Sequence, residues 1–252
     1  MNPAEWLKRT AMRAPQAVAL LQADALKASY SDFNRAAAGF GAALREQGIG
    51  KGSRVAVFMS NRVEYLIALY GIWYAGAAAV PINAKLHAKE AEWIIRDAGA
   101  CLLISDDSHA PDLAALLTNE AAGLLSADGG EFAEMCTCDP LLEPIDLEPS
   151  DLLWLFYTSG TTGRPKGVMI TCAMIASMSY NYFVDVDSVS AEDAILYAAP
   201  MSHGAGLYNF MHVMKGARHV VPSSGGFDPR EIFALGKSVD NVSMFAAPTM
   251  VR

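Results

Sequence analysis

The residues best suited to chemistry gather in one loop, between Thr158 and Gly167, where small polar side chains interrupt an apolar sequence. Glycines there remove Cβ and permit positive φ, so successive backbone N–H groups can turn toward one bound oxyanion. Hydroxyl groups add donors that rotate to suit the anion, and a lysine adds a mobile charge. The composition predicts a loop that holds a polyphosphate. The residues that could do so are Thr158, Ser159, Gly160, Thr161, Thr162, Gly163, Arg164 and Lys166.

This loop differs from the Walker phosphate loop, in which glycine directly precedes the lysine and a helix begins at that point. Here Pro165 precedes Lys166 and Gly167 follows it. Proline biases the residue before it toward extended backbone, and the apolar run at 168–170 is typical of a strand. Because residues 152–157 also suit a buried strand, we expect the order strand, loop, strand. A surface hairpin without a ligand would need only one or two of these residues.

A second candidate group is the segment from Pro200 to Leu207, which follows a predicted strand and opens a predicted helix. This order places His203 at the carboxyl end of a strand, where α/β proteins bind ligands. The pattern alone favours a structural histidine, because one imidazole can satisfy two polar neighbours. The remaining histidines have no comparable setting and receive no role: His87, His109, His212 and His219.

The elements that must position these residues alternate between helix and strand, which is typical of a mostly parallel sheet covered by helices. Ser31 is the predicted N-cap of a helix that ends at Gly48, and Asn61 with Glu64 predicts a capping box for the next helix. Other helices are predicted at 3–14, 89–98, 171–182 and 229–238, and strands at 18–21, 54–59, 79–82, 101–104, 194–198, 217–221 and 243–246.

Two segments interrupt this alternation. Residues 121–139 are dominated by alanine, glycine, serine and acidic side chains, and we interpret them as a surface excursion. Residues 139–149 contain three prolines, which predict an extended link into the strand before the loop. Residues 65–82 are uncharged over a length that could span a membrane, but Gly71, Gly76 and Pro81 favour a buried helix followed by a short strand.

Composition excludes several classes of protein. With 252 residues, 52% of them hydrophobic, the chain can form one or two globular domains with a sizeable core. A formal net charge of −8 without a basic run argues against nucleic acid or an anionic membrane surface as partner. The four cysteines form no C-x-x-C pair, and the amino terminus has no apolar signal region, so we expect reduced thiols and a cytoplasmic protein.

The segment from Tyr157 to Val168, YTSGTTGRPKGV, resembles the signature loop of the adenylate-forming superfamily, which includes acyl-CoA synthetases, peptide-synthetase adenylation domains and luciferases. Two earlier stretches resemble acyl-CoA synthetases in particular: residues 50–57 followed by Asn61, and residues 75–83. Cys172 departs from the pattern, since many relatives carry histidine after the threonine at this helix cap. The resemblance covers essentially the whole chain.

The resemblance implies that a carboxylic acid reacts with ATP to give an acyl-adenylate and pyrophosphate, after which the acyl group passes to coenzyme A. The loop residues Ser159, Gly160, Thr161, Thr162 and Gly163 would cradle the β- and γ-phosphates. Lys166 would offset their charge, and Thr158 or Thr161 would help to hold Mg²⁺. His203 would position the carboxylic acid substrate and would not act as a general base.

The implied fold is the incomplete amino-terminal lobe of such an enzyme, with helix-covered, mostly parallel sheets. One α/β layer would span residues 48–185, and a second, truncated layer would combine residues 1–45 with 190–252. The tyrosine-glycine-x-threonine-glutamate segment of the family is absent, so we expect a carboxy-terminal portion of the chain to be missing and the fragment alone to be inactive. Sheet edges left open would favour self-association.

Other functions remain open. The chain could be a small ATP-binding regulatory module, or its acyl acceptor could differ from coenzyme A. A nucleotide hydrolase would need a carboxylate base near the loop, whereas Glu148 and Asp151 precede the strand at its far end.

Overall fold

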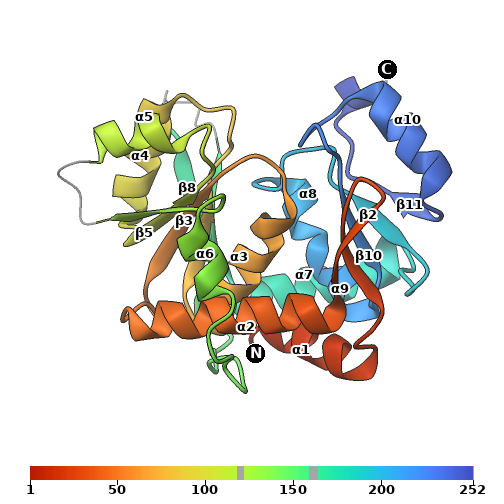
Figure 1. Cartoon of the computed structure of the whole chain (residues 1–252), viewed down its shortest axis with the longest axis horizontal. Coiled ribbons are helices and arrows are strands. Elements are labelled where there is room, and N and C mark those ends of the chain that lie inside the picture. Colours follow the sequence, from red (N-terminus) through yellow and green to blue (C-terminus); the bar gives the residue numbers. More distant parts are fainter. Residues whose placement is uncertain (118–121, 159–163, 252) are drawn as a thin grey trace.

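Two β-sheets and the helices between them form the structure, a computed structural model that describes residues 1–117, 122–158 and 164–251. Figure 1 places the sheet of β3, β5 and β8 on one side and the sheet of β2, β10 and β11 on the other. Helix α3 lies between them, and the long helix α2 runs across both. The predicted class, α/β with mostly parallel sheets, is therefore confirmed.

The first sheet has six strands in the order β6-β5-β3-β4-β7-β8. Its pairs are parallel except β7 with β8, which are antiparallel. The strand bounds are β3 Arg54–Phe58, β4 Ala78–Pro81, β5 Leu102–Ser105, β6 Gly123–Ser126, β7 Leu152–Thr158 and β8 Lys166–Thr171. Strand β8 is an edge strand in the described part of the chain, with Val168 and Met169 exposed. Self-association through this apolar edge stays a prediction.

The second sheet has five strands in the order β11-β9-β10-β1-β2. Only the β1–β2 pair is antiparallel. The strands are β1 Val18–Gln22, β2 Ala25–Ser29, β9 Ala194–Leu196, β10 Arg218–Val221 and β11 Val242–Ser243. Strands β9 and β10 lie within the predicted ranges, β11 shares only Ser243 with the predicted 243–246, and β2 was not predicted. Most side chains of β2 are exposed, so the strand lacks the alternation of apolar and polar residues that marks a half-buried strand.

The helices cover the sheets in layers. Buried residues of α4 and α5 pack on the outer face of the six-stranded sheet, and Leu235 of α10 packs on the outer face of the five-stranded sheet. One large core fills the space between the sheets. The helices are α1 Ala4–Arg13, α2 Tyr30–Glu46, α3 Val63–Tyr74, α4 Ala88–Ala98, α5 Ala110–Leu116, α6 Gly130–Met135, α7 Cys172–Asp185, α8 Gly204–Leu207, α9 Asn209–Lys215 and α10 Pro229–Ser238.

Helix α3 occupies the middle of this core and is buried on nearly every side. Its aromatic side chains Tyr65, Tyr70, Trp73 and Tyr74 are all core residues, as predicted. The segment 65–82 thus divides into most of α3 and strand β4. Within the described ranges, no helix combines the length and the apolar character that a membrane crossing requires.

Three local predictions are wrong. Ser29, and not Ser31, caps α2: its Oγ accepts from the Asp32 N–H, and Asp32 reaches back to the Ser29 N–H. Asn61 does not cap α3, because its side chain forms tertiary hydrogen bonds instead. The described part of the predicted surface excursion contains β6 and α6, and it buries Leu125, Phe132 and Met135. Apolar side chains spaced this widely give no clear period, so the sequence hid their burial.

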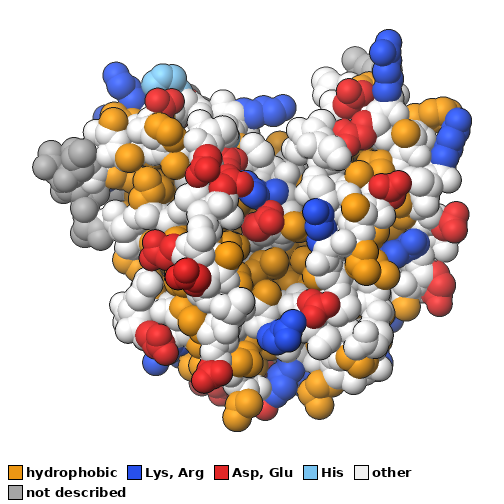
Figure 2. Space-filling view, in the orientation of Figure 1, with side chains coloured by type: hydrophobic (Ala, Val, Ile, Leu, Met, Phe, Trp, Pro, Cys, Tyr) orange, Lys and Arg blue, Asp and Glu red, His pale blue; other side chains and the backbone are white. Residues whose placement is uncertain are grey.

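The charged surface is mixed. Figure 2 shows acidic and basic side chains interspersed on the displayed face, around an apolar hollow. This arrangement agrees with the net charge of −8. A site for an anionic ligand therefore depends on local donors and not on a broad basic field.

Helices α2 and α3 approach closely at two glycines. A Cβ on Gly41 would lie 2.6 Å from Tyr74 Cβ and 3.0 Å from the Gly71 carbonyl oxygen. We expect Gly41→Ala to lower the free energy of unfolding by about 1–3 kcal/mol, because the helices must separate. Gly236→Ala in exposed α10 is the matched control, since a Cβ added there would meet no neighbouring heavy atom within 4 Å. This variant should raise the free energy of unfolding by about 0.5–1 kcal/mol, because alanine suits a helix better than glycine. Urea unfolding measures both; equal effects would contradict this packing.

A buried histidine should make the fold sensitive to acid. The His219 ring stacks on Tyr197, whose hydroxyl lies 2.8 Å from Nδ1. Burial, with a further contribution from His212, holds the pKa of His219 well below its ordinary value. Below about pH 6.5 the unfolded chain therefore binds a proton at this histidine that the folded chain does not bind. The free energy of unfolding decreases as the pH is lowered, by up to about 1.4 kcal/mol per pH unit. Urea midpoints at pH 7.5 and 5.5 should differ less in His219→Gln; an unchanged difference would exclude His219 as the cause.

Candidate functional site

The two strands predicted on either side of the loop are present and paired. Strands β7 and β8 pair antiparallel, with Thr158 opposite Lys166 and Tyr157 opposite Gly167. This register brings Thr158 and Lys166 together at the loop end of the strand pair, where both are exposed. The predicted phosphate ligands Ser159, Gly160, Thr161, Thr162 and Gly163 lie outside the described residues.

The base of the loop is held by Tyr157, the residue before Thr158. Its side chain is buried, and its hydroxyl donates to Asp97 Oδ2 of α4 at 2.6 Å. Trp93 packs edge-on against the ring, with centroids 6.2 Å apart. Burial, together with Asp97, raises the pKa of Tyr157 above its ordinary value, so the phenol keeps its proton at neutral pH. The end of β7 is thereby fixed to the helix beside it.

His203 approaches the same strand from the other sheet. It is the residue before α8, in the segment that follows β9. Its ring lies edge-on to Phe156 of β7, with centroids 5.5 Å apart, and its Nδ1 is 2.9 Å from Ser202 Oγ. Burial lowers the pKa of His203, so the ring is neutral at pH 7. The prediction that His203 follows a strand and opens a helix is confirmed.

A cavity of 390 Å³ joins these features. It lies between the second half of the loop, the end of β4 and His203, and its lining combines apolar walls with a few polar groups. The described lining consists of Pro81, Ile82, Asn83, Leu86, Glu90, Ile94, Tyr157, Arg164, Pro165 and His203. A small organic molecule fits a space of this size and character.

The segment after β4 was missed as part of the site. Asn83 lies two residues after the end of β4, which neighbours β7 in the sheet, so its position at the carboxyl end of a parallel strand was a usable signal. Asn83 also borders a second cavity of 220 Å³, whose polar lining includes Ser60, Asn61 and Ser202. The two cavities therefore adjoin at the carboxyl ends of strands from both sheets.

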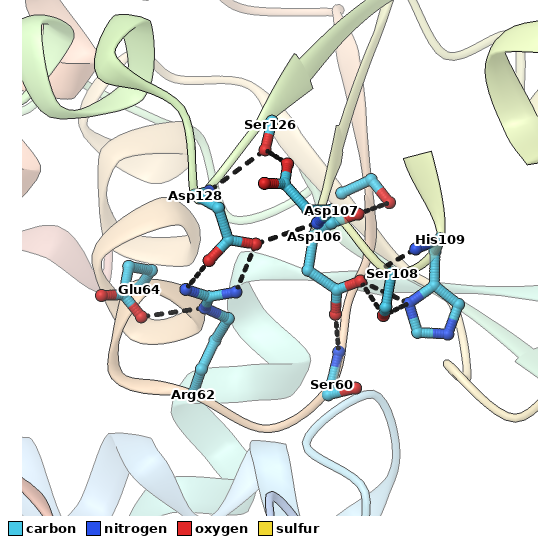
Figure 3. Close-up of polar contacts among 10 residues, drawn as sticks. Ser60, Arg62, Glu64, Asp106, Asp107, Ser108, His109, Ser126 and Asp128 are labelled. Carbon is cyan, nitrogen blue, oxygen red and sulfur yellow. Dashed lines mark hydrogen bonds and ion pairs between the residues drawn. The ribbon is translucent and has the colours of Figure 1, made fainter. Parts of the chain in front are cut away.

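A polar network supports this region from below. Asp106 accepts hydrogen bonds from the Ser60 N–H at 2.8 Å, Ser108 Oγ at 2.6 Å and His109 Nδ1 at 2.5 Å (Figure 3). Burial raises the pKa of Asp106, but these hydrogen bonds outweigh it and hold the pKa below its ordinary value. His109 Nε2 lies 3.0 Å from the Ala84 carbonyl oxygen, in the segment that borders both cavities.

This network is structural, although it contains serine, histidine and aspartate. Both Ser108 and Asp106 contact the same ring nitrogen, Nδ1, and Nε2 is engaged by a carbonyl group. A nucleophile relay requires the serine and the carboxylate on opposite nitrogens. Arg62 extends the network by a two-pronged contact with Asp128 and a further one with Glu64, all visible in Figure 3.

The described residues offer little to a metal on their own. Across 1–117, 122–158 and 164–251, no group of three or more histidine, cysteine, aspartate or glutamate side chains could hold a metal ion. Of the two predicted Mg²⁺ ligands, Thr158 is exposed at the end of β7, and Thr161 lies outside the described residues. One exposed hydroxyl does not hold Mg²⁺ by itself, so such an ion would need phosphate oxygens and waters as further ligands.

The positions and contacts of the acidic side chains disfavour a nucleotide hydrolase. Asp151 lies before β7, at the end opposite the loop, where it pairs with Lys51 at 2.6 Å. In the described lining of the larger cavity the acidic side chain is Glu90, and it accepts a hydrogen bond from the His87 N–H as part of a helix cap. Asp151 is therefore far from the loop, and the carboxylates nearer to it, Glu90 and Asp97, are engaged in a helix cap and in the Tyr157 hydrogen bond.

Comparison with known proteins gives one family. The family model described as "AMP-binding enzyme" matches residues 7–252. Feruloyl-CoA synthase of Amycolatopsis sp is 34% identical over 250 residues, which cover 98% of this chain and 49% of that protein. Long-chain-fatty-acid–CoA ligase FadD13 of Mycobacterium tuberculosis H37Rv is 32% identical over 217 residues, covering 83% and 42%. The chain spans about half the length of the curated relatives it matches.

Solved structures agree. The inhibitor-bound N-terminal domain of FACL13 from Mycobacterium tuberculosis superposes with a TM-score of 0.87 at 28% identity, covering 99% of this chain and 64% of that one. O-succinylbenzoate coenzyme A synthetase from Bacillus subtilis, in complex with ATP and magnesium ion, gives 0.82 at 22% identity over 98% of this chain and 64% of that one. The latter likeness is one of fold.

The anchoring of Tyr157 can be tested with Mg²⁺ tripolyphosphate as ligand. We expect Tyr157→Phe to weaken its binding by up to about tenfold, because the loss of one hydrogen bond frees the base of the loop. Tyr74→Phe is the matched control: its hydroxyl donates to Asn34 Oδ1 at 2.6 Å, away from the loop. Both variants should have similarly lowered melting temperatures. Calorimetric titration with Mg²⁺ tripolyphosphate should show weaker binding by Tyr157→Phe and unchanged binding by Tyr74→Phe. Equal affinities would show that this contact does not serve the loop.

Proposed function

Because the chain belongs to the AMP-binding enzyme family, we propose that the whole protein containing it activates a carboxylic acid with ATP and transfers the acyl group to coenzyme A. The observation that carries the proposal is the cavity shared by the end of the β7–β8 loop and His203. A polyphosphate held by the loop and a carboxylate beside His203 would meet there. Bringing two reactants together in this way is a large part of catalysis.

The loop is proposed to bind the triphosphate of ATP. Thr158 and Lys166 stand at its two ends, and both side chains are exposed to a ligand. Between them, Ser159, Gly160, Thr161, Thr162 and Gly163 would supply hydroxyl and backbone N–H donors. Lys166 would neutralise charge that accumulates as pyrophosphate leaves. Such donors act best when they are already oriented, and the Tyr157 contact with Asp97 fixes the end of β7 from which the loop departs.

Thr158 and Thr161 are proposed to help hold Mg²⁺ together with the phosphates. The ion would screen the phosphate charge and orient the β- and γ-oxygens. Hydroxyl groups are weak ligands, so these residues would position an ion that ATP brings with it. The affinity for the metal would therefore depend on the nucleotide.

His203 is proposed to position the carboxylic acid. Its Nδ1 faces Ser202, which leaves Nε2 as the ring atom that can face the cavity. The neutral ring can donate or accept one hydrogen bond there, but it adds no positive charge. Orientation of the acid toward the α-phosphorus is the role that fits, and general base catalysis is not needed for a carboxylate nucleophile.

Coenzyme A is the proposed acyl acceptor because the two relatives described above, feruloyl-CoA synthase and a fatty-acid–CoA ligase, are named for it. A different acceptor remains the alternative, since Surfactin synthase subunit 3 of Bacillus subtilis is 30% identical over 217 residues. The named acids of the relatives, ferulic and long-chain fatty, are chemically dissimilar. We therefore propose the carboxylic acid class and no single member.

The reaction can be tested by ATP–pyrophosphate exchange in the whole protein. We expect Thr161→Ala combined with Lys166→Ala to lower the rate by at least about 100-fold, because oriented donors of this kind are each worth 10² or more. Lys51→Ala removes the same charge at the opposite end of β7 and is the matched control. A near-normal rate in the double variant would contradict the proposed loop function.

A binding measurement on residues 1–252 tests the alternative that the chain is a small ATP-binding regulatory module. Calorimetric titration of residues 1–252 with Mg²⁺ ATP should give weak, roughly millimolar binding if adenine and ribose contacts come from elsewhere in the whole protein. Micromolar binding by this chain would favour a self-sufficient nucleotide-binding module.

A further inference from the structure

One buried carboxamide connects the two sheets at the site. Asn61 lies in the turn between β3 and α3, on the six-stranded sheet, and is 8% exposed. Its Nδ2 donates to the carbonyl oxygens of Tyr197 at 2.9 Å and Ala199 at 2.8 Å. Its Oδ1 accepts from the Met201 N–H at 2.8 Å. All three partners belong to the segment that follows β9 of the five-stranded sheet.

The turn that carries Asn61 is itself held firmly. The preceding Ser60 N–H donates to Asp106, which follows β5 (Figure 3). On the other side, Gly225 after β10 approaches so closely that a Cβ there would lie 3.2 Å from the Asn61 carbonyl oxygen. Gly225 also has φ of +66°, which favours glycine. Asn61 is therefore a fixed point against which the segment after β9 is set.

Residues 200–206, which include and follow the hydrogen-bond partner Met201, are also closely packed. The His203 N–H donates to Pro200 O at 3.1 Å, and the Gly206 N–H donates to His203 O at 2.9 Å. A Cβ on Gly206 would lie 1.8 Å from the Met201 carbonyl oxygen, so α8 rests directly on that residue. A shift of Met201 would therefore carry His203 with it.

This coupling matters because His203 works across the sheet boundary. Its own segment extends from the five-stranded sheet, whereas its ring packs on Phe156 and borders the loop of the six-stranded sheet. The relative position of the two sheets at this end decides where the imidazole lies over the cavity. A helix-capping role for Asn61, the simpler explanation, is excluded because α3 has no side-chain cap.

We propose that Asn61 is a positioning residue that sets His203 relative to the β7–β8 loop by holding residues 197–201. This inference rests on the proposed role of His203 in binding the carboxylic acid. Asn61 acts on His203 through Met201 and the turn that follows.

The chain offers a close control in Asn2. Asn2 is also buried, and its Nδ2 donates to two carbonyl oxygens, of Trp73 at 2.6 Å and Ile145 at 2.9 Å. Its Oδ1 accepts from the Ala4 N–H at 2.9 Å. The hydrogen-bond pattern is the same, but none of its partners lines either cavity of the site. Asn2→Ala therefore measures the general cost of losing such a side chain.

The test compares Asn61→Ala with Asn2→Ala in this chain by amide hydrogen exchange and histidine resonances. The Ile82 N–H, bonded to Val57 O within the six-stranded sheet, serves as internal reference. In Asn61→Ala the Met201 amide should exchange at least about tenfold faster relative to Ile82, and the His203 imidazole resonance should shift. In Asn2→Ala both should stay near wild type. Asn61→Ser, which replaces the carboxamide by a hydroxyl able to keep one hydrogen bond, should give smaller changes in the same direction and replaces Asn61→Ala if that variant does not fold.

Equal responses of Met201 and His203 to the Asn61 and Asn2 variants would overturn the proposal. In the whole protein, Asn61→Ala should lower ATP–pyrophosphate exchange by about tenfold or more, since small displacements of positioning groups cost that much, with Asn2→Ala close to wild type. If the resonances shift as expected but His203→Ala leaves exchange unchanged, then the role of His203 in the proposed function fails, whereas the positioning by Asn61 stands.

Discussion

The structure depends on burying helix α3, which has no polar face to turn toward water. A helix of this kind is stable only where other elements cover it on every side. The two sheets and helix α2 provide that cover, and Gly41 and Gly71 let α2 and α3 approach closely enough to exclude water. Since α3 is shared by both sheets, its burial determines how they stand relative to each other. The site inherits its geometry from this shared core.

The carboxyl ends of the strands then require polar partners, because backbone groups leave the hydrogen-bond ladders there without leaving the interior. Asp106 satisfies the turn after β3, and Asn61 satisfies the segment after β9. These side chains connect strand ends that are distant in sequence. The ends of β3, β4, β5 and β9 thereby form one rigid rim around the cavities, with the β7–β8 loop beside it.

The division between rigid support and reactive residues follows from this arrangement. Residues proposed to contact ligands, such as Thr158 and Lys166, are exposed at the end of a strand pair. Their support comes from buried contacts one residue away, as with Tyr157 and Asp97. His203 combines the two roles. Ser202 holds one of its ring nitrogens, and the ring borders the cavity. A site built in this way can hold anions without a basic surface around it.

Local chemistry was sufficient to predict much of this protein from its sequence. The alternation of helix and strand indicated the class of fold, and the Gly- and Thr-rich loop with Pro165 indicated a strand pair instead of a Walker loop. The position of His203 between a strand and a helix was also predictable. Each of these inferences depends on neighbours within a few residues, where spacing and residue type carry the physical information.

Tertiary structure alone decided the rest. Asn61 has the sequence pattern of a helix cap, but three hydrogen bonds across the sheets outweigh one local bond. Ser29 and Ser31 are equally good caps by type, and the strand β2 that ends at Ser29 determined which one was used. That Asn83 and Glu90 would share a cavity with His203 depended on the order of strands in a sheet and on contact between two sheets. Such long-range pairing depends on the whole core, so no short stretch of sequence contains it.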